Sequence, residues 1–325
     1  MIRKDTLRKA VAILQSPYKR TMILAQHGFY KNMSDEDFLR MQFKNVFGYE
    51  PDLDHPQTYS EKLQWLKLHD RRPEYTVMVD KYEVKAYVSP LIGEEHIIRT
   101  LGVWDKFDEI DFSCLPDQFV LKCTHDSGGS VICGDRSRFD SQAAKKKLEK
   151  SLGRNYYLQN REWPYKNVKP RIIAEEYMVD ESGYELKDYK IFTFGGKARA
   201  LLIAADRTNP HEETHFDFYD MEFNHLPFTN GHPCADHPAG KPDSLDEMRR
   251  MAEHIAAAGN LPQARIDFYD VNGTVYFGEI TFFHWSGFEP FVPDEWDKRF
   301  GEWLRLPEKY PANGSGNCRS REKSE

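Results

Sequence analysis

The sequence of 325 residues lacks three features that would each place it in a familiar class. It has no run approaching the roughly 18 apolar residues that a membrane-spanning helix needs. It has only five cysteines, an odd number with no CxxC pair, which indicates reduced thiols in a cytosolic protein rather than a disulfide framework. It also has no long basic tract, and its formal net charge is −7, so nucleic acid is not expected as the main partner.

Other signals are missing or incomplete. The phosphate-binding pattern GxxxxGK[ST] does not occur, so any nucleotide site must be built differently. Residues 1–20 are basic and amphipathic, but their apolar part is too short and too interrupted for a signal peptide. We expect a surface helix there, with peripheral contact to an anionic membrane surface as the alternative. The pattern His232-x-Cys234-x-x-His237 lacks an evident fourth ligand and is not expected to bind zinc.

What the chain has in quantity is aromatic side chains, at 14%, together with 30% charged residues. This combination is typical of a folded, soluble enzyme rather than of a disordered chain. The length is sufficient for two or three lobes with shared cores.

The most informative stretch is Arg265–Phe288, which is predicted to form two strands. They are joined by Asn272-Gly273, the dipeptide that tolerates positive φ at both central turn positions. Asp267, Glu279 and Thr281 interrupt these apolar strands. Two carboxylates on paired strands repel each other and lose solvation unless a cation lies between them, and Mg²⁺ takes oxygen ligands of this kind. The alternative is an edge hairpin whose carboxylates face solvent.

A glycine-containing loop lies upstream, between predicted strands at Phe119–Thr124 and Val131–Cys133. Glycine lets backbone N–H groups approach phosphate oxygens, and Lys122, just before the loop, is placed to bind the α- and β-phosphates of a nucleotide. An ordinary flexible hairpin is the alternative. The candidate loop residues are His125, Ser127, Gly128, Gly129 and Ser130.

The predicted strand Arg171–Met178 starts apolar and turns acidic. A purine needs an acceptor for its exocyclic amine and backbone groups for its ring edge. Glu175 and the backbone of Tyr177 and Met178 are candidates for these contacts. A strand that ends in solvated acids is the alternative.

A second predicted hairpin begins at Asp188 and turns at Gly195-Gly196. Asp188 is a candidate acceptor for ribose hydroxyls, with a salt-bridged surface as the alternative. Three cationic residues are candidates for binding anionic groups: Lys190, Arg207 and Arg265.

Helix signals and one long loop complete the pattern. Thr58 and Glu61 form a capping-box pattern before a helix that ends at His69. Helices are also predicted at Val77–Tyr87 and at Ser244–Gly259, with Ser244 as the N-cap. Thr208–Asp243 is dense in Pro, His and Asp and is predicted to be a loop, and loops of this length are usually either functional or disordered.

In this order, the features resemble the TupA-like branch of the ATP-grasp superfamily. The resemblance falls within roughly residues 45–306. The phrases that carry it are TYSEKLQWLKLHDR (58–71), VDKYEVKAYV (79–88), LGVWDKFDEIDF (101–112), LPDQFVLKCTHDSGG (115–129), REWPYKNVKPRIIAEEYM (161–178), DYKIFTFGGKA (188–198) and YFGEITF (276–282).

The resemblance implies an α+β fold of the ATP-grasp type, with ATP held between two α+β lobes. It implies a pre-ATP-grasp region (58–116), a small lobe (117–180) and a large lobe with the metal site (181–310). Outside the resemblance, the spacing of apolar residues predicts a helical N-terminal segment (1–57), and the polar composition predicts a disordered tail (311–325).

The resemblance also assigns roles by position. Lys81 and Lys122 are the implied phosphate-binding lysines, and residues 125–130 cover the phosphates. The implied adenine contacts are Glu175, Tyr177 and Met178, and the ribose contact is Asp188. The implied Mg²⁺ ligands are Asp267, Glu279 and Thr281, with Thr281 where many ATP-grasp enzymes have Asn. The residues expected to act on the transferring phosphate and the substrate are Arg265, Lys190 and Arg207.

The implied function is a cytoplasmic ATP-dependent ligase. It would join a uronic acid of a cell-surface polysaccharide, or of its precursor, to an amine through an acyl phosphate. A polysaccharide glycosyltransferase, an ATP-dependent glycan or sugar kinase and a non-catalytic nucleotide-binding protein are the alternatives. Asp35-Glu36-Asp37 and Asp52-Leu53-Asp54 have the spacing of glycosyltransferase metal motifs. Neither follows a convincing parallel strand, so both are interpreted as solvated acids. The oligomeric state stays open.

Overall fold

The structure is a computed structural model that describes residues 16–180, 183, 186–206 and 213–308. Its α-helices are α2 (Pro17–Gln26), α3 (Asp35–Phe47), α4 (Tyr59–His69), α5 (Glu74–Val79), α6 (Glu83–Ile92), α7 (Ser141–Leu152), α8 (Tyr157–Asn160), α9 (Leu245–Ala258) and α10 (Glu295–Trp303). Its strands are β1 (Thr100–Trp104), β2 (Phe119–Cys123), β3 (Val131–Cys133), β4 (Ile172–Glu176), β5 (Asp188–Phe194), β6 (Lys197–Ala205), β7 (His215–Tyr219), β8 (Gln263–Val271) and β9 (Thr274–Thr281). Short 3₁₀ turns are η1 (Glu94–His96), η2 (Phe107–Glu109), η3 (Phe112–Cys114), η4 (Arg136–Arg138), η5 (Trp163–Asn167) and η6 (His284–Gly287).

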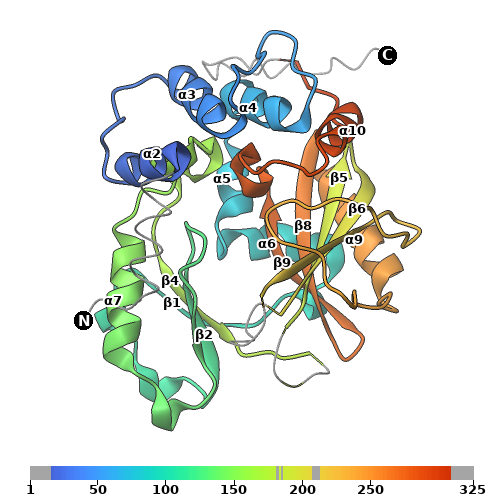
Figure 1. Ribbon diagram of the computed structural model, residues 1–325. Helices are drawn as coiled ribbons and strands as arrows, with labels where there is room; N and C mark the ends of the chain where they lie inside the picture. The colour runs from blue at the N-terminus through green and yellow to red at the C-terminus, as the bar shows by residue number, and fades with distance from the viewer. Residues whose placement is uncertain (1–15, 181–182, 184–185, 207–212, 309–325) are drawn as a thin grey trace, which may run out of the picture.

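The described strands form two antiparallel sheets, one of four strands in the order β1-β4-β2-β3 and one of five in the order β7-β6-β5-β8-β9. In Figure 1 the smaller sheet lies with α7 on the left and the larger sheet with α9 on the right, below the blue helices α2, α3 and α4. Helices and antiparallel sheets segregated in this way confirm the predicted α+β class.

The hairpin that the sequence predicts is present as β8 and β9. Asn272 and Gly273 have φ of 54° and 84° and make the turn. Asp267 and Glu279 are direct cross-strand partners. The register shifts just beyond them, and Gly278 lies so close that an added Cβ would be 3.0 Å from the Asp267 carbonyl oxygen. The two carboxylates therefore share one face of the sheet.

Packing of helices on the larger sheet supports this face. The apolar side of α9 packs on β5, β6 and β8 through buried residues such as Met248 and Ile255. The capping box of Thr58 and Glu61 is present at the start of α4, as predicted, and α4 packs on α10. One face of the larger sheet is thereby covered by α9, while Glu279 of the edge strand β9 lines a cavity.

One predicted helix is in fact two. Val77–Tyr87 is broken between α5 and α6 because the Asp80 carboxylate accepts hydrogen bonds from the backbone N–H groups of Tyr82, at 2.8 Å, and Glu83, at 3.2 Å. Those bonds start a new helix, and Lys81 lies in the turn rather than on a helix.

Two details of the segment after β6 also differ from the prediction. Thr208–Asp243 is not all loop, because it contains the edge strand β7, where Phe216 and Phe218 are buried. The Ser244 hydroxyl does not cap α9 and donates to Asp270 instead. The predicted tail 311–325, the first 15 residues and Arg207 lie outside the described residues.

Among the helices that the structure describes, none combines the length and the apolar character needed to cross a bilayer.

Candidate functional site

The centre of the site is the buried carboxylate of Asp267, which is 1% exposed. Arg265 Nε lies 2.7 Å from its Oδ1, and Arg265 Nη2 lies 2.8 Å from its Oδ2. Lys190 Nζ lies 2.5 Å from the same Oδ2. A carboxylate that is buried this deeply needs cationic partners. The positive charge expected between Asp267 and Glu279 is therefore supplied in part by the side chains of Arg265 and Lys190.

Arg265 also reaches across to β9 and beyond. Its Nη2 donates to Glu279 Oε1 at 3.3 Å and to the Thr281 hydroxyl at 3.0 Å. Its Nη1 lies 2.7 Å from Nδ1 of His284, whose Nε2 lies 3.0 Å from Oδ1 of Asn230. Burial, with help from Arg265, lowers the pKa of His284 well below its ordinary value. The imidazole is therefore neutral, so Nδ1 accepts from Arg265 and Nε2 donates to Asn230.

Glu279 is the more accessible carboxylate, with 37% of its side chain exposed. Burial acts to raise its pKa, but Lys81, Arg265 and Lys190 outweigh burial and lower the pKa to about 2. Lys81 Nζ is 3.7 Å from Oε2, and the Thr281 hydroxyl donates to Oε1 at 3.1 Å. Glu279 is therefore ionised at neutral pH and faces solvent space.

Lys81 connects the two sheets. Its backbone N–H donates to the Thr124 carbonyl at 3.1 Å, and its Nζ donates to the Asp126 carbonyl at 2.5 Å. The loop after β2 is thereby tied to Glu279 of β9. The break after α5 is what brings this lysine into the site.

The predicted phosphate loop has two glycines that a side chain would disturb, Gly128 through its backbone conformation and Gly129 through lack of space. Gly128 has φ of 80°, and a Cβ on Gly129 would lie 2.6 Å from the Ser151 hydroxyl oxygen. The ring of His125 is buried, with Nε2 at 3.2 Å and 3.1 Å from the carbonyls of Ser151 and Arg154. The imidazole therefore anchors the loop to the C-terminal end of α7, a placement that the composition of the loop does not reveal.

Glu175 is buried and is held by two lysines. Lys85 Nζ lies 2.6 Å from Oε1, and Lys122 Nζ contacts Oε2. Burial acts to raise the pKa of Glu175, but Lys122 and Lys85 lower it below its ordinary value. Lys122 thus lies beside Glu175, an ion pair that the sequence analysis does not predict. Lys85 is a partner that the sequence analysis missed, although it lies one helical turn after Lys81.

The remaining predicted contacts lie along the chain that joins the sheets. Tyr177 and Met178 follow β4 directly, and Asp188 is the first residue of β5. Asp188 is buried, and its Oδ1 is 3.2 Å from Lys190 Nζ. Lys190 therefore contacts both Asp188 and Asp267.

A cavity of about 700 Å³ opens from the ionic cluster. Its walls include Lys190, Arg265, Glu279 and Thr281 from the larger sheet and Ser127 from the loop. The opposite wall comes from α2, η6 and the α8 region. Of the predicted site residues, these five line the cavity directly.

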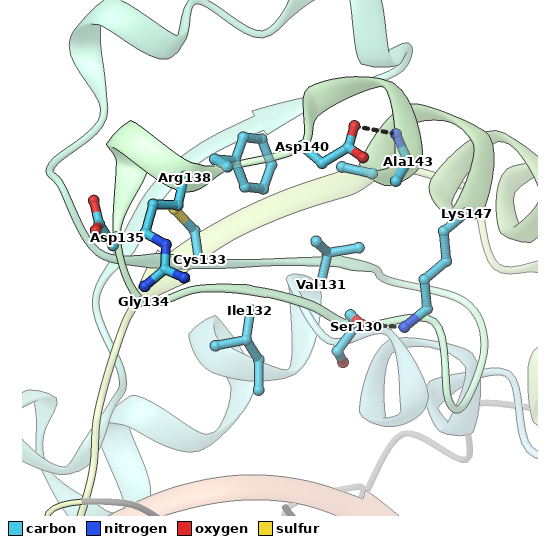
Figure 2. A pocket seen from close by; sticks show the side chains of 12 residues that line it. Ser130, Val131, Ile132, Cys133, Gly134, Asp135, Arg138, Asp140, Ala143 and Lys147 are labelled. Carbon is cyan, nitrogen blue, oxygen red and sulfur yellow. Dashed lines mark hydrogen bonds between the residues drawn. The ribbon is translucent and has the colours of Figure 1, made fainter.

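A second cavity, of about 800 Å³, lies between β3 and α7 (Figure 2). Ser130 belongs to this cavity, where its carbonyl accepts from Lys147 Nζ at 2.6 Å. Asp267 and Glu279 are not among the residues that line it. Its size alone does not make it the reaction site.

A possible metal-binding group occurs elsewhere, and within the described part of the chain it is the one group of three such side chains. The ligand atoms of Asp217, His225 and Cys234 lie within 4.8 Å of one another. His225 Nε2 is 3.2 Å from Asp217 Oδ1. The group shares only Cys234 with the His232-x-Cys234-x-x-His237 pattern, so that sequence spacing does not define it.

The profile of the TupA-like ATPgrasp family matches residues 61–305. The chain belongs to this family. Membership confirms the predicted resemblance and the ATP-grasp fold. It covers all of the predicted site residues, whereas α2 and α3 precede the matched range. No curated protein matches the sequence.

Solved structures show weaker similarity to this TupA-like chain. D-alanine–D-alanine ligase from Bacillus anthracis complexed with ATP is 17% identical, with a TM-score of 0.36, over 63% of this chain and 55% of that one. L-amino acid ligase from Bacillus licheniformis is 14% identical, with a TM-score of 0.40, over 83% and 56%. D-cycloserine synthetase DcsG is 17% identical, with a TM-score of 0.39, over 70% and 69%. The chain spans little more than half the length of the first two, and at these values the similarity extends no activity to it.

Proposed function

We propose that this protein is an ATP- and Mg²⁺-dependent ligase that activates a carboxylate by phosphoryl transfer and joins it to an amine. The observation that carries the proposal is the convergence of Lys81, Lys190 and Arg265 on Asp267 and Glu279 at one end of a cavity. Phosphoryl and acyl transfer need positioned charge more than a side-chain nucleophile. This cluster supplies such charge.

The oxygen atoms of Asp267, Glu279 and Thr281 fit Mg²⁺ in their chemistry, since Mg²⁺ prefers carboxylate and other hard oxygen ligands. Glu279 is ionised and partly exposed to the cavity. Lys190 neutralises Asp267, with its Nζ 2.5 Å from Oδ2. When bound, Mg²⁺ supplies neutralisation of the phosphate charges.

The nucleotide would lie between the sheets. Lys122, beside Glu175, is placed for the α- and β-phosphates, and Gly128 and Gly129 allow the loop backbone to approach them. Glu175 and the Tyr177–Met178 backbone would meet the adenine, and Asp188 the ribose. These roles rest on position within the family pattern.

In the proposed reaction, a carboxylate oxygen of the substrate attacks the γ-phosphorus of ATP and ADP leaves. The resulting acyl phosphate is attacked at its carbonyl carbon by an amine, which loses a proton, and inorganic phosphate leaves. Arg265 and Lys190 line the cavity where the transferring group would lie, and they would neutralise its charge. Neutral His284 fixes the orientation of Arg265 without adding charge.

For the substrate we propose a uronic acid of a cell-surface polysaccharide, or of its precursor, on the cytoplasmic side of the membrane. This proposal follows from the resemblance to the TupA-like branch. Arg207 and the segment after β6 would face this substrate.

The test follows ATP consumption with Mg²⁺, a panel of uronic acids and a panel of amines, with hydroxylamine included to trap an acyl phosphate. ADP release that requires both the acid and the amine, with a product of the expected mass, supports the ligase. ADP release with the acid alone and a stable phosphorylated product would establish a kinase. Sugar transfer from a UDP-sugar without ATP would overturn the ligase proposal.

The matched variants are Glu279→Gln and, on exposed surface of α10, Glu302→Gln. Glu279→Gln should abolish ATP turnover and leave the circular dichroism spectrum unchanged. Glu302→Gln should behave as wild type. Retained turnover in Glu279→Gln would remove the metal assignment.

A further inference from the structure

The turn η6 has an unusual backbone. Trp285 has φ of 48°, Ser286 has φ of 56° and Gly287 has φ of 65°, so three successive residues are left-handed. A residue with a side chain loses roughly 1–2 kcal/mol in this conformation. Two of the three carry side chains, and such a turn persists only where surrounding contacts enforce it.

Buried polar groups enforce it here. Gln64 Nε2 donates to the carbonyls of Ser286, at 3.2 Å, and Gly287, at 3.1 Å. Lys67 Nζ donates to the Ser286 carbonyl at 2.8 Å. Asn160 Nδ2 donates to the Ser286 hydroxyl at 3.0 Å, and that hydroxyl donates to Glu162. The turn is therefore fixed from α4 and from the α8 region together.

The turn leaves the indole of Trp285 exposed. Trp285 is 41% exposed, whereas its neighbours His284 and Ser286 are 4% and 6% exposed. The indole lies against Gly231, where an added Cβ would be 2.7 Å from Nε1. The Phe216 ring is 6.0 Å from it at an interplanar angle of 28°.

His232 completes an aromatic wall, which we define as Phe216, His232 and Trp285. The His232 ring centroid is 6.0 Å from that of Trp285 and 4.6 Å from that of Phe216. All three residues line the 700 Å³ cavity. They come from β7, the loop after it and η6, so the fold gathers them from three places.

The aromatic wall is connected to the end of the cavity where Arg265 lies. His284, the residue before Trp285, contacts the Arg265 guanidinium. The rest of the lining includes groups that form hydrogen bonds, among them Gln159, Tyr156 and Glu289. The indole of Trp285 offers a flat apolar face beside these polar groups. Such a surface suits a sugar-like ring, which has C–H groups on its face and hydroxyls at its edge.

We propose that Trp285 is the platform on which the ring of the carboxylate substrate lies, and that the site selects a cyclic, polyhydroxylated acid over an acyclic one. This inference rests on the proposed ligase function and adds a specificity-determining residue to it. The carboxylate would point to Arg265 and Lys190, and the C–H face of the ring would pack on the indole π face. The left-handed turn keeps the indole uncovered for that contact.

A binding experiment tests the platform without requiring turnover. Trp285 is the most exposed of the six tryptophans, so acrylamide quenches its fluorescence most readily, and the difference between wild type and Trp285→Phe isolates its contribution. With MgADP present, D-glucuronate or D-galacturonate should shield the wild-type protein from acrylamide in a saturable way. L-glutamate, an acyclic acid, should not. Equal shielding by L-glutamate, or no shielding by either ring acid, would overturn the proposal.

Kinetics with the acid that supports ATP turnover give the second readout. Trp285→Ala should raise the KM for that acid by about tenfold, the loss of about 1.4 kcal/mol, with kcat and the KM for ATP little changed. Trp285→Phe should restore most of the loss. Tyr49→Ala, which removes a 47% exposed aromatic side chain remote from the cavity lining, is the control. An unchanged KM in Trp285→Ala would contradict the platform.

The two proposals fail in different ways. If no acid and amine support ATP turnover but a ring acid shields Trp285, the ligase assignment fails and the binding platform stands. If turnover occurs, Trp285→Ala keeps the wild-type KM and neither ring acid shields the wild-type protein from acrylamide, the platform fails and the ligase stands.

Discussion

The Arg265 guanidinium binds the Asp267 carboxylate through two nitrogens, Nε at 2.7 Å from Oδ1 and Nη2 at 2.8 Å from Oδ2. The two residues are two positions apart on β8. Residues at this spacing share one face of a sheet. The same alternation places Glu279 and Thr281 on the facing strand, where Arg265 also contacts both. One guanidinium therefore connects all three predicted metal ligands.

Arg265→Lys tests whether this geometry matters beyond its charge. Lysine keeps the positive charge but lacks the planar fork that contacts several acceptors at once. We expect ATP turnover to fall by about 10²–10³-fold, as for the loss of a preorganised donor, and the folded structure to remain. Coupled ADP-release assays measure this. Arg249→Lys on the exposed side of α9 is the control, and wild-type turnover in Arg265→Lys would show that charge alone suffices.

Much of the fold and part of the site were predictable because local chemistry determined them. Asn272-Gly273 fixes the β8–β9 turn, and the Thr58 capping box fixes the start of α4. Strand alternation then determines that Asp267 and Glu279 meet. Each of these features depends on residues close in sequence or on one hairpin register.

The rest depends on contacts distant in sequence. Asp80 breaks the predicted helix, and its carboxylate is also held by Arg171, 91 positions later in the chain. His284 becomes a positioning group because Arg265 and Asn230 contact its two nitrogens. Nothing in the spacing of these residues signals such contacts. The strand β7 was missed because it lies among Pro, His and Asp residues typical of loops.

Asp35 illustrates the same limit. It was interpreted as a solvated acid, but Arg71 Nη2 lies 2.7 Å and Arg161 Nε 3.3 Å from its carboxylate. Its side chain is only 18% exposed. It therefore joins α3 to the α8 region, a structural role that neither the helix-start pattern nor the Asp-x-Asp spacing predicts.

Gly129→Ala tests the phosphate loop. An added Cβ would lie 2.6 Å from the Ser151 hydroxyl oxygen and 3.2 Å from Asp126 Oδ1, so the loop must shift. Because the Asp126 carbonyl also binds Lys81, we expect the KM for ATP to rise about tenfold, equivalent to about 1.4 kcal/mol. Gly134→Ala, where a Cβ meets nothing within 4 Å, is the matched control. Equal KM values for the two variants would refute a phosphate role for the loop.

Asp297→Asn is expected to stabilise the protein at alkaline pH. Burial raises the pKa of Asp297 to about 6 from 3.8, against hydrogen bonds from Ser60. A raised folded-state pKa gives stability that is present below about pH 4 and is lost as pH rises through about 6. Asparagine keeps an acceptor for the Ser60 N–H but cannot ionise, so at pH 8 the variant should be more stable by about 1–3 kcal/mol.

Urea unfolding of wild type and Asp297→Asn at pH 4 and pH 8 measures this difference. The advantage of the variant should shrink at pH 4, where the wild-type carboxyl is protonated in the folded state. Asp294→Asn, at the exposed start of α10, should show no such pH dependence. A less stable Asp297→Asn protein at pH 8 would mean that the charged hydrogen bond to Ser60 outweighs burial.

Lys67→Met should release the left-handed turn. Lys67 is fully buried, and burial lowers its pKa to about 7 despite the opposing effect of Glu162. Its ammonium group donates to Gln64, to the Asn160 carbonyl and to the Ser286 carbonyl. Methionine fits the space but leaves these acceptors and Glu162 without their partner, so we expect a loss of about 3–5 kcal/mol in the free energy of unfolding.

Adding Glu162→Gln to Lys67→Met separates charge from packing. If the buried Glu162 charge causes much of the loss, the double variant will be less destabilised than the sum of the two single changes. Lys298→Met on the exposed side of α10 is the control for losing a lysine. Acrylamide quenching should change in Lys67→Met, because Trp285 follows the turn that Lys67 fixes. If Lys67→Met loses the expected free energy of unfolding but its acrylamide quenching is unchanged, Gln64 and Asn160 alone hold the indole in place.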